Sequence, residues 1–334
     1  MSAPTRSRSG EGRDRTRPPA PEPLPHPVVD NHCHLDIADG PDGSWLATDE
    51  ALAAAAAVGV PRIVQIGCDL PGAAWAVEAA ERYEALVAGV ALHPNEAPRL
   101  AAEGRLEEGL AEIERLAASS DRVRAVGETG LDHFRTGEDG RDAQVESFRR
   151  HVDLAKRLDK TLVIHDRDAH DDVLRVLEDA GPPDRVVFHC FSGDRAMAEH
   201  CVRRGWWLSF AGTVTFKNAT GLREALAAVP PDRVLVETDA PYLTPQAVRK
   251  ERNQPARVVL TFALVNRGFL AGRRRVFLLI RYRANDDTWS YGQGTLDNHT
   301  VACTESALDD PVVDFAFDKA DRPGVGAKFH RFWK

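Results

Sequence analysis

Short apolar runs rich in β-branched residues alternate with longer segments rich in Ala, Leu, Glu and Arg from residue 28 onward. The runs predict strands, and the helical spacing of apolar residues in the longer segments predicts helices. The expected strands are Val28–Asn31, Arg62–Ile66, Leu86–Ala91, Val123–Gly127, Thr161–Ile164, Arg185–Phe188, Trp206–Phe210 and Arg233–Val236. The expected helices include 51–58, 107–118, 142–158, 171–180, 196–204 and 222–228. This alternation predicts a (β/α)₈ TIM barrel.

A doubly wound open sheet is the alternative α/β fold for the same alternation. It often binds nucleotides through a Gly-x-Gly-x-x-Gly turn after a strand, and the chain has no such turn. The pattern also predicts three regions. Residues 1–27 are rich in Pro and Arg and are expected to form a disordered tail, residues 28–259 form the barrel, and residues 260–334 form a divergent segment of uncertain fold.

Polar residues with metal-binding side chains follow five of the predicted strands. His32 and His34 are separated by one residue, so both can point to the same side of a strand end. The other candidates, at the ends of later strands, are Glu128, His165, His189 and Asp239. Because the carboxyl ends of barrel strands form the catalytic face, we expect these six side chains to converge there.

Four imidazoles and two carboxylates suit Zn, Mn or Mg. Six ligands exceed the needs of one tetrahedral ion, and a carboxylate such as Glu128 can bridge two ions. The sequence therefore predicts two divalent metal cations that together activate a water. Each residue alone also has a structural interpretation, a hydrogen-bonded histidine or a helix cap, and the agreement of five strand ends favours the metal site.

Composition and net charge limit the cellular location and the binding partners that we expect for this protein. The net charge of −8 gives no general attraction for nucleic acid, so an anionic substrate needs local positive charge or bound metal. The five cysteines include no Cys-x-x-Cys pair and predict reduced thiols in a cytoplasmic protein. No apolar stretch is long enough to span a membrane, and no obligate protein partner is expected.

The chain resembles the TatD family of metal-dependent deoxyribonucleases over about residues 28–259. The matching segments are DNHCHLD at 30–36, LHPNEAPR at 92–99, AVGETGLD at 125–132, VIHDRDAHDDVL at 163–174, FHCFSG at 188–193 and VETDAPYLTP at 236–245. This resemblance implies an amidohydrolase-like barrel with two divalent cations that hydrolyses phosphodiesters of DNA.

The resemblance also implies roles for individual residues. His32, His34 and Asp239 would hold one metal, His165 and His189 the second, and Glu128 would bridge them. His93 would lie near the substrate phosphate, with a turn histidine beside Pro94 as the alternative. The family ends with a helix pair that residues 260–334 do not resemble. A divergent extension or a shifted reading frame would each produce such a segment.

The expected mechanism is an attack by a metal-activated water on a phosphodiester of DNA. Asp239 is the expected proton acceptor, with Glu128 beside it in the catalytic set, and Glu237 is expected to orient a ligand histidine. Arg167 could contact a phosphate or form a surface ion pair. Two alternatives stay open. One is another hydrolase, such as an aminoacyl-tRNA deacylase or amidohydrolase, and the other is a non-catalytic nucleic-acid-binding protein that uses the basic N-terminal tail and the arginines of 267–283.

Overall fold

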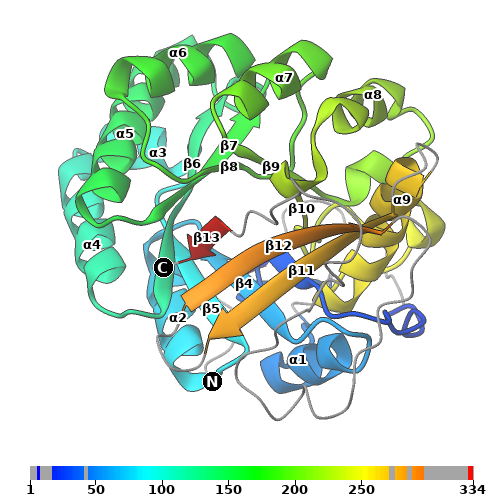
Figure 1. The fold of residues 1–334 in the computed structure, drawn as a ribbon. Coiled ribbons are helices and arrows are strands. Elements are labelled where there is room, and N and C mark those ends of the chain that lie inside the picture. Colours follow the sequence, from blue (N-terminus) through cyan, green and yellow to red (C-terminus); the bar gives the residue numbers. More distant parts are fainter. Residues whose placement is uncertain are drawn as a thin grey trace.

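The computed structural model describes residues 6–7, 17–40, 44–270, 275–283, 288–296 and 330–333, with side chains for 17–40 and 44–266. Eight parallel strands form a nearly closed barrel, and helices surround them as an outer ring (Figure 1). This arrangement confirms the predicted TIM barrel.

The barrel strands pair in the order β10-β9-β8-β7-β6-β5-β4-β2, and all the pairs are parallel. Their bounds are β2 Val29–Cys33, β4 Arg62–Gly67, β5 Leu86–Val90, β6 Val123–Asp132, β7 Thr161–Arg167, β8 Val186–Phe188, β9 Trp207–Phe210 and β10 Val234–Val236. All eight predicted strands are therefore present. The main difference is β6, which continues five residues beyond its predicted end at Gly127.

The helices that cover the barrel follow the predicted segments closely. Their bounds are α1 Thr48–Ala56, α2 Leu70–Arg82, α3 Glu96–Ala102, α4 Leu106–Ala118, α5 Glu138–Arg157, α6 His170–Ala180, α7 Arg195–Arg203, α8 Thr220–Ala228 and α9 Val258–Leu270. Short 3₁₀ turns lie at Gly212–Thr215, Pro231–Arg233, Gln246–Val248 and Pro255–Arg257. Among the described residues, no helix is both long enough and apolar enough to cross a membrane.

The barrel interior is filled by side chains from each of its eight strands. This cluster comprises Val29, Val64, Ile66, Cys68, Val87, Ala125, Val163, Val187, Trp207 and Leu235. Side chains alternate along a strand, so a residue two positions after an inward-facing one also faces inward. His165 follows Val163 in this way, and His189 follows Val187. The same pleat that builds the core thus aims both histidines into the barrel mouth.

The first and last strands meet through contacts at their carboxyl ends. The Asp239 amide donates to the His32 carbonyl at 2.9 Å, and the His34 amide donates to the Ala240 carbonyl at 2.8 Å. Beside them the buried Asp30 carboxylate accepts from the Thr238 amide at 2.8 Å and from the Thr238 hydroxyl. These bonds close the barrel at the place where the metal-binding candidates lie.

Some segments at the two ends of the chain are also described. Residues 17–27 lie against the barrel, where the Leu24 amide donates to the Val58 carbonyl and the Arg257 guanidinium donates to the carbonyls of Pro18 and Pro19. A short β1, Arg6–Ser7, pairs with β3, Ile37–Ala38. Strands β11 Arg275–Arg283, β12 Thr288–Leu296 and β13 His330–Trp333 form a separate antiparallel sheet. The three predicted domain boundaries stay predictions, and the side chains of the arginine-rich segment lie outside the described part.

Candidate metal centre

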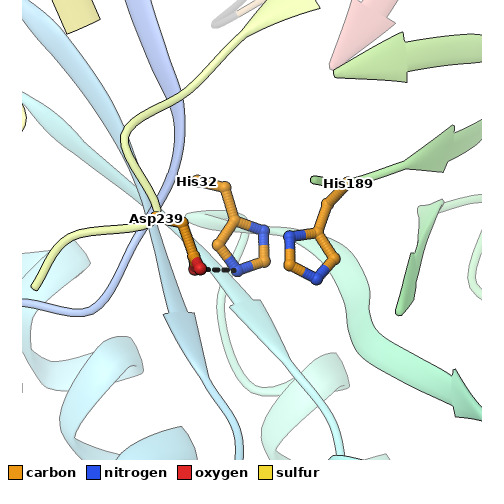
Figure 2. A group of neighbouring side chains, drawn as sticks. All are labelled: His32, His189 and Asp239. Atoms are coloured by element: carbon orange, nitrogen blue, oxygen red, sulfur yellow. Dashed lines mark ion pairs between the residues drawn. The ribbon is translucent and has the colours of Figure 1, made fainter. Parts of the chain in front are cut away.

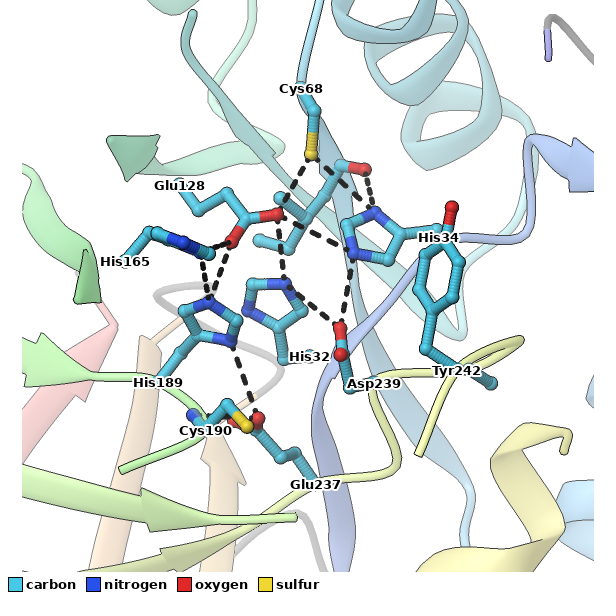
Figure 3. A network of polar contacts seen from close by, with 12 residues as sticks. His32, His34, Cys68, Glu128, His165, His189, Cys190, Glu237, Asp239 and Tyr242 are labelled. Carbon is cyan, nitrogen blue, oxygen red and sulfur yellow. Dashed lines mark hydrogen bonds and ion pairs between the residues drawn. The ribbon is translucent and has the colours of Figure 1, made fainter. Parts of the chain in front are cut away.

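All six predicted metal ligands converge at the carboxyl ends of the barrel strands (Figure 3). His32 and His34 come from β2 and the residue after it, and Glu128 lies within β6. His165 lies within β7, while His189 and Asp239 follow β8 and β10. Five of the six side chains are buried, and His165 is half-buried.

The Glu128 carboxylate lies between two pairs of histidines. Its Oε1 atom lies 3.7 Å from His32 Nε2 and 3.6 Å from His34 Nε2. Its Oε2 atom lies 3.2 Å from His165 Nδ1 and 2.6 Å from His189 Nε2. Each carboxylate oxygen thus faces a different pair of imidazoles.

Asp239 completes the group around Oε1 of Glu128. Its Oδ1 atom lies 3.3 Å from His34 Nε2 and 3.8 Å from His32 Nε2. The His32 ring stacks on that of His189, with centroids 3.9 Å apart. Figure 2 shows the two rings next to each other, with Asp239 beside His32. The two halves of the site are therefore in direct contact.

Two hydrogen bonds fix which nitrogen of a histidine faces the centre. His34 Nδ1 donates to the Ile66 carbonyl at 3.0 Å, which leaves the lone pair of Nε2 directed toward Glu128 and Asp239. His189 Nδ1 donates to Glu237 Oε1 at 3.3 Å, and Glu237 also accepts from the Cys190 amide at 2.8 Å. Glu237 thus contacts a candidate ligand histidine, as the sequence predicted. Such partners set the orientation of metal-binding imidazoles.

The predicted substrate residues differ in their distance from the cluster. The His93 ring centroid lies 4.5 Å from that of His165, and the Asn95 amide donates to His93 Nδ1 at 3.0 Å. His93 therefore belongs to the centre. The Arg167 guanidinium instead covers the exposed ring of Phe134, with its central carbon 3.9 Å from the ring centroid. Among the described contacts, none joins Arg167 to the six histidine and carboxylate residues.

Two further residues in the centre were not predicted. Asp132 ends β6 and places its Oδ2 atom 3.3 Å from His165 Nε2, so His165 lies between two carboxylates. The Cys68 thiol donates to Glu128 Oε1 at 3.0 Å and lies 3.7 Å from His34 Nδ1. Asp132 belongs to the quoted segment 125–132, so the motif carried a signal for it. Cys68 follows an ordinary strand, and nothing in its spacing indicates the contact.

Burial and neighbouring charges shift the pKa values of the cluster in different directions. Desolvation alone would lower the pKa of His189, but the carboxylates of Glu128 and Glu237 raise this pKa well above its ordinary value. Likewise, burial would raise the pKa of Glu128, but the surrounding histidines hold this pKa well below its ordinary value. Burial and the neighbouring His165 lower the pKa of His93 to about 3.

The donor set fits divalent cations. His32 is fully buried, and neither of its ring nitrogens has a hydrogen-bond partner among the described residues. Such orphaned atoms are rare in folded proteins and need a partner. Three groups offer ligand atoms close enough to share an ion: His32, His189 and Asp239; His32, His34 and Glu128; and His93, Glu128 and His165. Imidazole nitrogens and carboxylate oxygens are ordinary ligands of Zn and Mn.

Comparison with known proteins places this centre in a family. The model of the family described as TatD related DNase matches residues 29–268. An uncharacterized metal-dependent hydrolase TatD of Mycobacterium tuberculosis is 47% identical over 232 residues, which are 68% of this chain and 85% of that protein. An uncharacterized metal-dependent hydrolase of Bacillus subtilis, YabD, is 38% identical over 69% of this chain and 87% of its own length.

Solved structures agree with the sequence relatives. The crystal structure of YJJV, a TatD homologue from Escherichia coli, superposes with a TM-score of 0.63 at 30% identity, covering 72% of this chain and 90% of that one. A TatD family hydrolase from Entamoeba histolytica has the same fold, with a TM-score of 0.61 at 21% identity over 73% of this chain and 91% of its own. The chain therefore belongs to the TatD family of metal-dependent hydrolases.

Proposed function

We propose that this protein is a deoxyribonuclease that hydrolyses phosphodiester bonds of DNA with two divalent cations. The observation that carries the proposal is the position of Glu128, whose two oxygens face two separate pairs of histidines. A carboxylate in that position suits a bridging ligand between neighbouring ions. Two such ions lower the pKa of a water and stabilise the attacking and leaving oxygens of an in-line displacement.

The residues of the cluster have different roles in this proposal. His32, His34 and Asp239 would hold one cation, and His165 and His189 would hold the other. Asp239 lies at the mouth of the cluster with its side chain 12% exposed, so its carboxylate can reach a water and accept the water's proton. Asp239 and Glu128 are the proposed catalytic residues.

His93 is the proposed contact for the substrate phosphate. Its Nδ1 atom accepts a hydrogen bond from the Asn95 amide, so the ring proton of the neutral form lies on Nε2. An N–H group beside the metal cluster can donate to a phosphate oxygen. Arg167 is a second proposed phosphate contact, because its guanidinium stacks on Phe134 and stays positively charged there.

The test combines metal analysis with strand digestion. We expect the purified chain to bind about two divalent ions per molecule and to digest a single-stranded oligonucleotide labelled at its 3′ or 5′ end. Labelled DNA is compared with RNA, a D-aminoacyl-tRNA and small amides. Cleavage of the aminoacyl ester or of an amide, with DNA left intact, would establish a different hydrolase.

Replacing Asp239 by Asn is the sharpest variant. We expect DNA cleavage to fall by at least about 10³-fold, because the variant lacks both the ligand charge and the proposed proton acceptor. Asp179→Asn on the exposed face of α6 is the control and should retain activity. Full cleavage by the Asp239 variant would refute the assignment.

A further inference from the structure

A cavity of about 570 Å³ lies between α3 and the start of α5, and Asn95 in its lining is hydrogen-bonded to Asp132 of the metal centre. Its volume is within the range of small-molecule binding sites, roughly 300–1,000 Å³. The apolar part of its lining includes Pro98, Ala101 and Ala143, and the polar part includes Asn95 and Thr136. The small side chains leave room for a flat group.

The wall of this cavity is joined to the proposed catalytic cluster by hydrogen bonds. Asn95 Nδ2 donates to Asp132 Oδ2 at 3.3 Å, and the Thr136 hydroxyl donates to Asn95 Oδ1 at 3.2 Å. Asp132 in turn contacts His165 at 3.3 Å. The backbone N–H of Asn95 also donates to His93 Nδ1, as described above. A group in the cavity would therefore lie against residues that position two histidines of the centre.

The charged residues of the cavity lining favour a ligand with a single phosphate group. Arg135 lines the cavity, and its guanidinium forms no ion pair among the described residues. Asp139 lines it as well and offsets part of this positive charge. The cavity is consequently suited to a mostly neutral ligand that carries a single anionic group near Arg135.

We propose that this cavity binds the nucleotide next to the scissile phosphodiester in a single polynucleotide strand, with its base against the small apolar residues and its phosphate at Arg135. The proposal rests on the proposed function and adds a subsite for the neighbouring nucleotide, with Arg135 as its phosphate contact. The exposed Phe134, 62% accessible on the same β6–α5 connection, offers the next base a stacking surface.

The test measures strand binding separately from cleavage. A fluorescent, phosphorothioate-substituted single-stranded decanucleotide is titrated with the full chain in the presence of Ca²⁺, and its anisotropy is followed. Arg135→Gln should weaken binding about tenfold and flatten the slope of log Kd against log salt by roughly 0.7, because one phosphate contact is lost. Ala101→Trp should weaken binding similarly with the slope unchanged, because it fills the cavity without altering charge.

Two matched controls separate this effect from general damage. Ala111 is an exposed alanine on α4 outside the cavity, and Ala111→Trp should bind the strand like the wild type. Arg203→Gln removes an exposed arginine at the far end of α7 and should also leave Kd and salt slope unchanged. Equal weakening by the cavity variants and their controls would overturn the proposal, as would wild-type affinity in both cavity variants.

Cleavage kinetics distinguish this proposal from the proposed function. With Mn²⁺, kcat/KM is measured for the unmodified decanucleotide and for bis(p-nitrophenyl) phosphate. The cavity variants should lose at least five times more kcat/KM on the strand than on the small diester. An equal loss on both substrates would overturn the cavity proposal while leaving phosphodiester hydrolysis standing. A wild-type chain that cleaves neither substrate would refute the proposed function. The anisotropy titrations alone would then test whether the cavity binds the strand.

Discussion

At the scale of single residues, the metal centre depends on two carboxylates and a backbone carbonyl that hold histidines in place. Glu237 contacts His189, Asp132 contacts His165, and the Ile66 carbonyl holds His34. Each contact fixes a ring whose other nitrogen faces Glu128 or Asp239. The centre is therefore organised before any cation arrives, which lowers the ordering cost of binding one.

Glu237 provides a direct test of this support. Glu237→Gln removes the charge opposite His189 Nδ1 while keeping the size of the side chain, so we expect metal affinity to fall by about 10–100-fold. The measurement is a calorimetric titration of the chelated protein with Zn²⁺ or Mn²⁺. Glu224→Gln, on the exposed side of α8, is the control, and equal affinities in all three proteins would contradict the prediction.

His151 links stability to pH outside the metal centre. This histidine is buried in α5, accepts from the Leu92 amide and donates to the Ser147 carbonyl, and burial lowers its pKa to about 4. The unfolded chain takes up a proton near pH 6.5, so this residue reduces stability as pH falls from about 6.5 to about 4.

The His151 effect should amount to about 2 kcal/mol of unfolding free energy between pH 7 and pH 5. His151→Gln keeps one acceptor and one donor but does not titrate, so its stability should fall by correspondingly less over this interval. Urea unfolding of both proteins without metal measures the difference. Identical pH dependence in the two proteins would contradict the prediction.

At the scale of elements, the pattern of apolar runs was enough to find all eight strands, because a barrel buries each strand on both faces. It did not find the end of β6. Gly127 and Gly130 interrupt the apolar run there, with φ of 156° and 141°, and the pairing with β7 is irregular between Val126 and Thr129. This irregular stretch is what brings Glu128 into the barrel mouth and carries the strand on to Asp132.

Gly130 tests the need for this backbone geometry. A Cβ atom at this position would lie 2.0 Å from the His165 carbonyl oxygen, so Gly130→Ala must push β6 and β7 apart. We expect a loss of about 2 kcal/mol or more in unfolding free energy, together with weaker metal binding through His165. Thermal unfolding and metal titration measure the two effects.

Gly205 supplies the control for the Gly130 prediction. It also has a positive φ, 78°, but a Cβ atom there would meet nothing within 4 Å. Gly205→Ala should therefore cost about 1 kcal/mol from backbone strain alone and leave metal binding unchanged. A Gly130 variant that behaves like the Gly205 variant would show that β6 and β7 can separate freely.

At the scale of the whole molecule, the sequence predicted the barrel and the six converging ligand candidates from strand ends alone. It could not predict Cys68, because the thiol reaches Glu128 only where the ends of β4 and β6, which lie on either side of β5, come close together. The sequence also did not predict the hydrogen bonds that join the first and last strands of the barrel. The bonds between Asp30 and Thr238 join residues 208 positions apart, and no local pattern reports such a pairing.

Thr238→Val tests this closure. The variant removes a hydroxyl donor from the buried Asp30 carboxylate, so we expect a loss of about 1–3 kcal/mol in unfolding free energy. Binding of the cation proposed at His32, His34 and Asp239 should weaken with it. Thr261→Val is the control, because the buried Thr261 hydroxyl has no hydrogen-bond partner among the described residues. The measurement is urea unfolding. An equal loss of unfolding free energy in the two variants would show that the hydrogen bonds between Asp30 and Thr238 do not stabilise the barrel.

The same closure determines when during synthesis the site can first exist. His32 and His34 leave the ribosome early, whereas Asp239 and its neighbours on β10 come some two hundred residues later. A nascent chain that ends before Thr238 lacks one wall of the cluster and the bonds that hold the first strand in place. A hydrolase built in this way stays inert throughout most of its translation and gains its metal centre only when the barrel is complete.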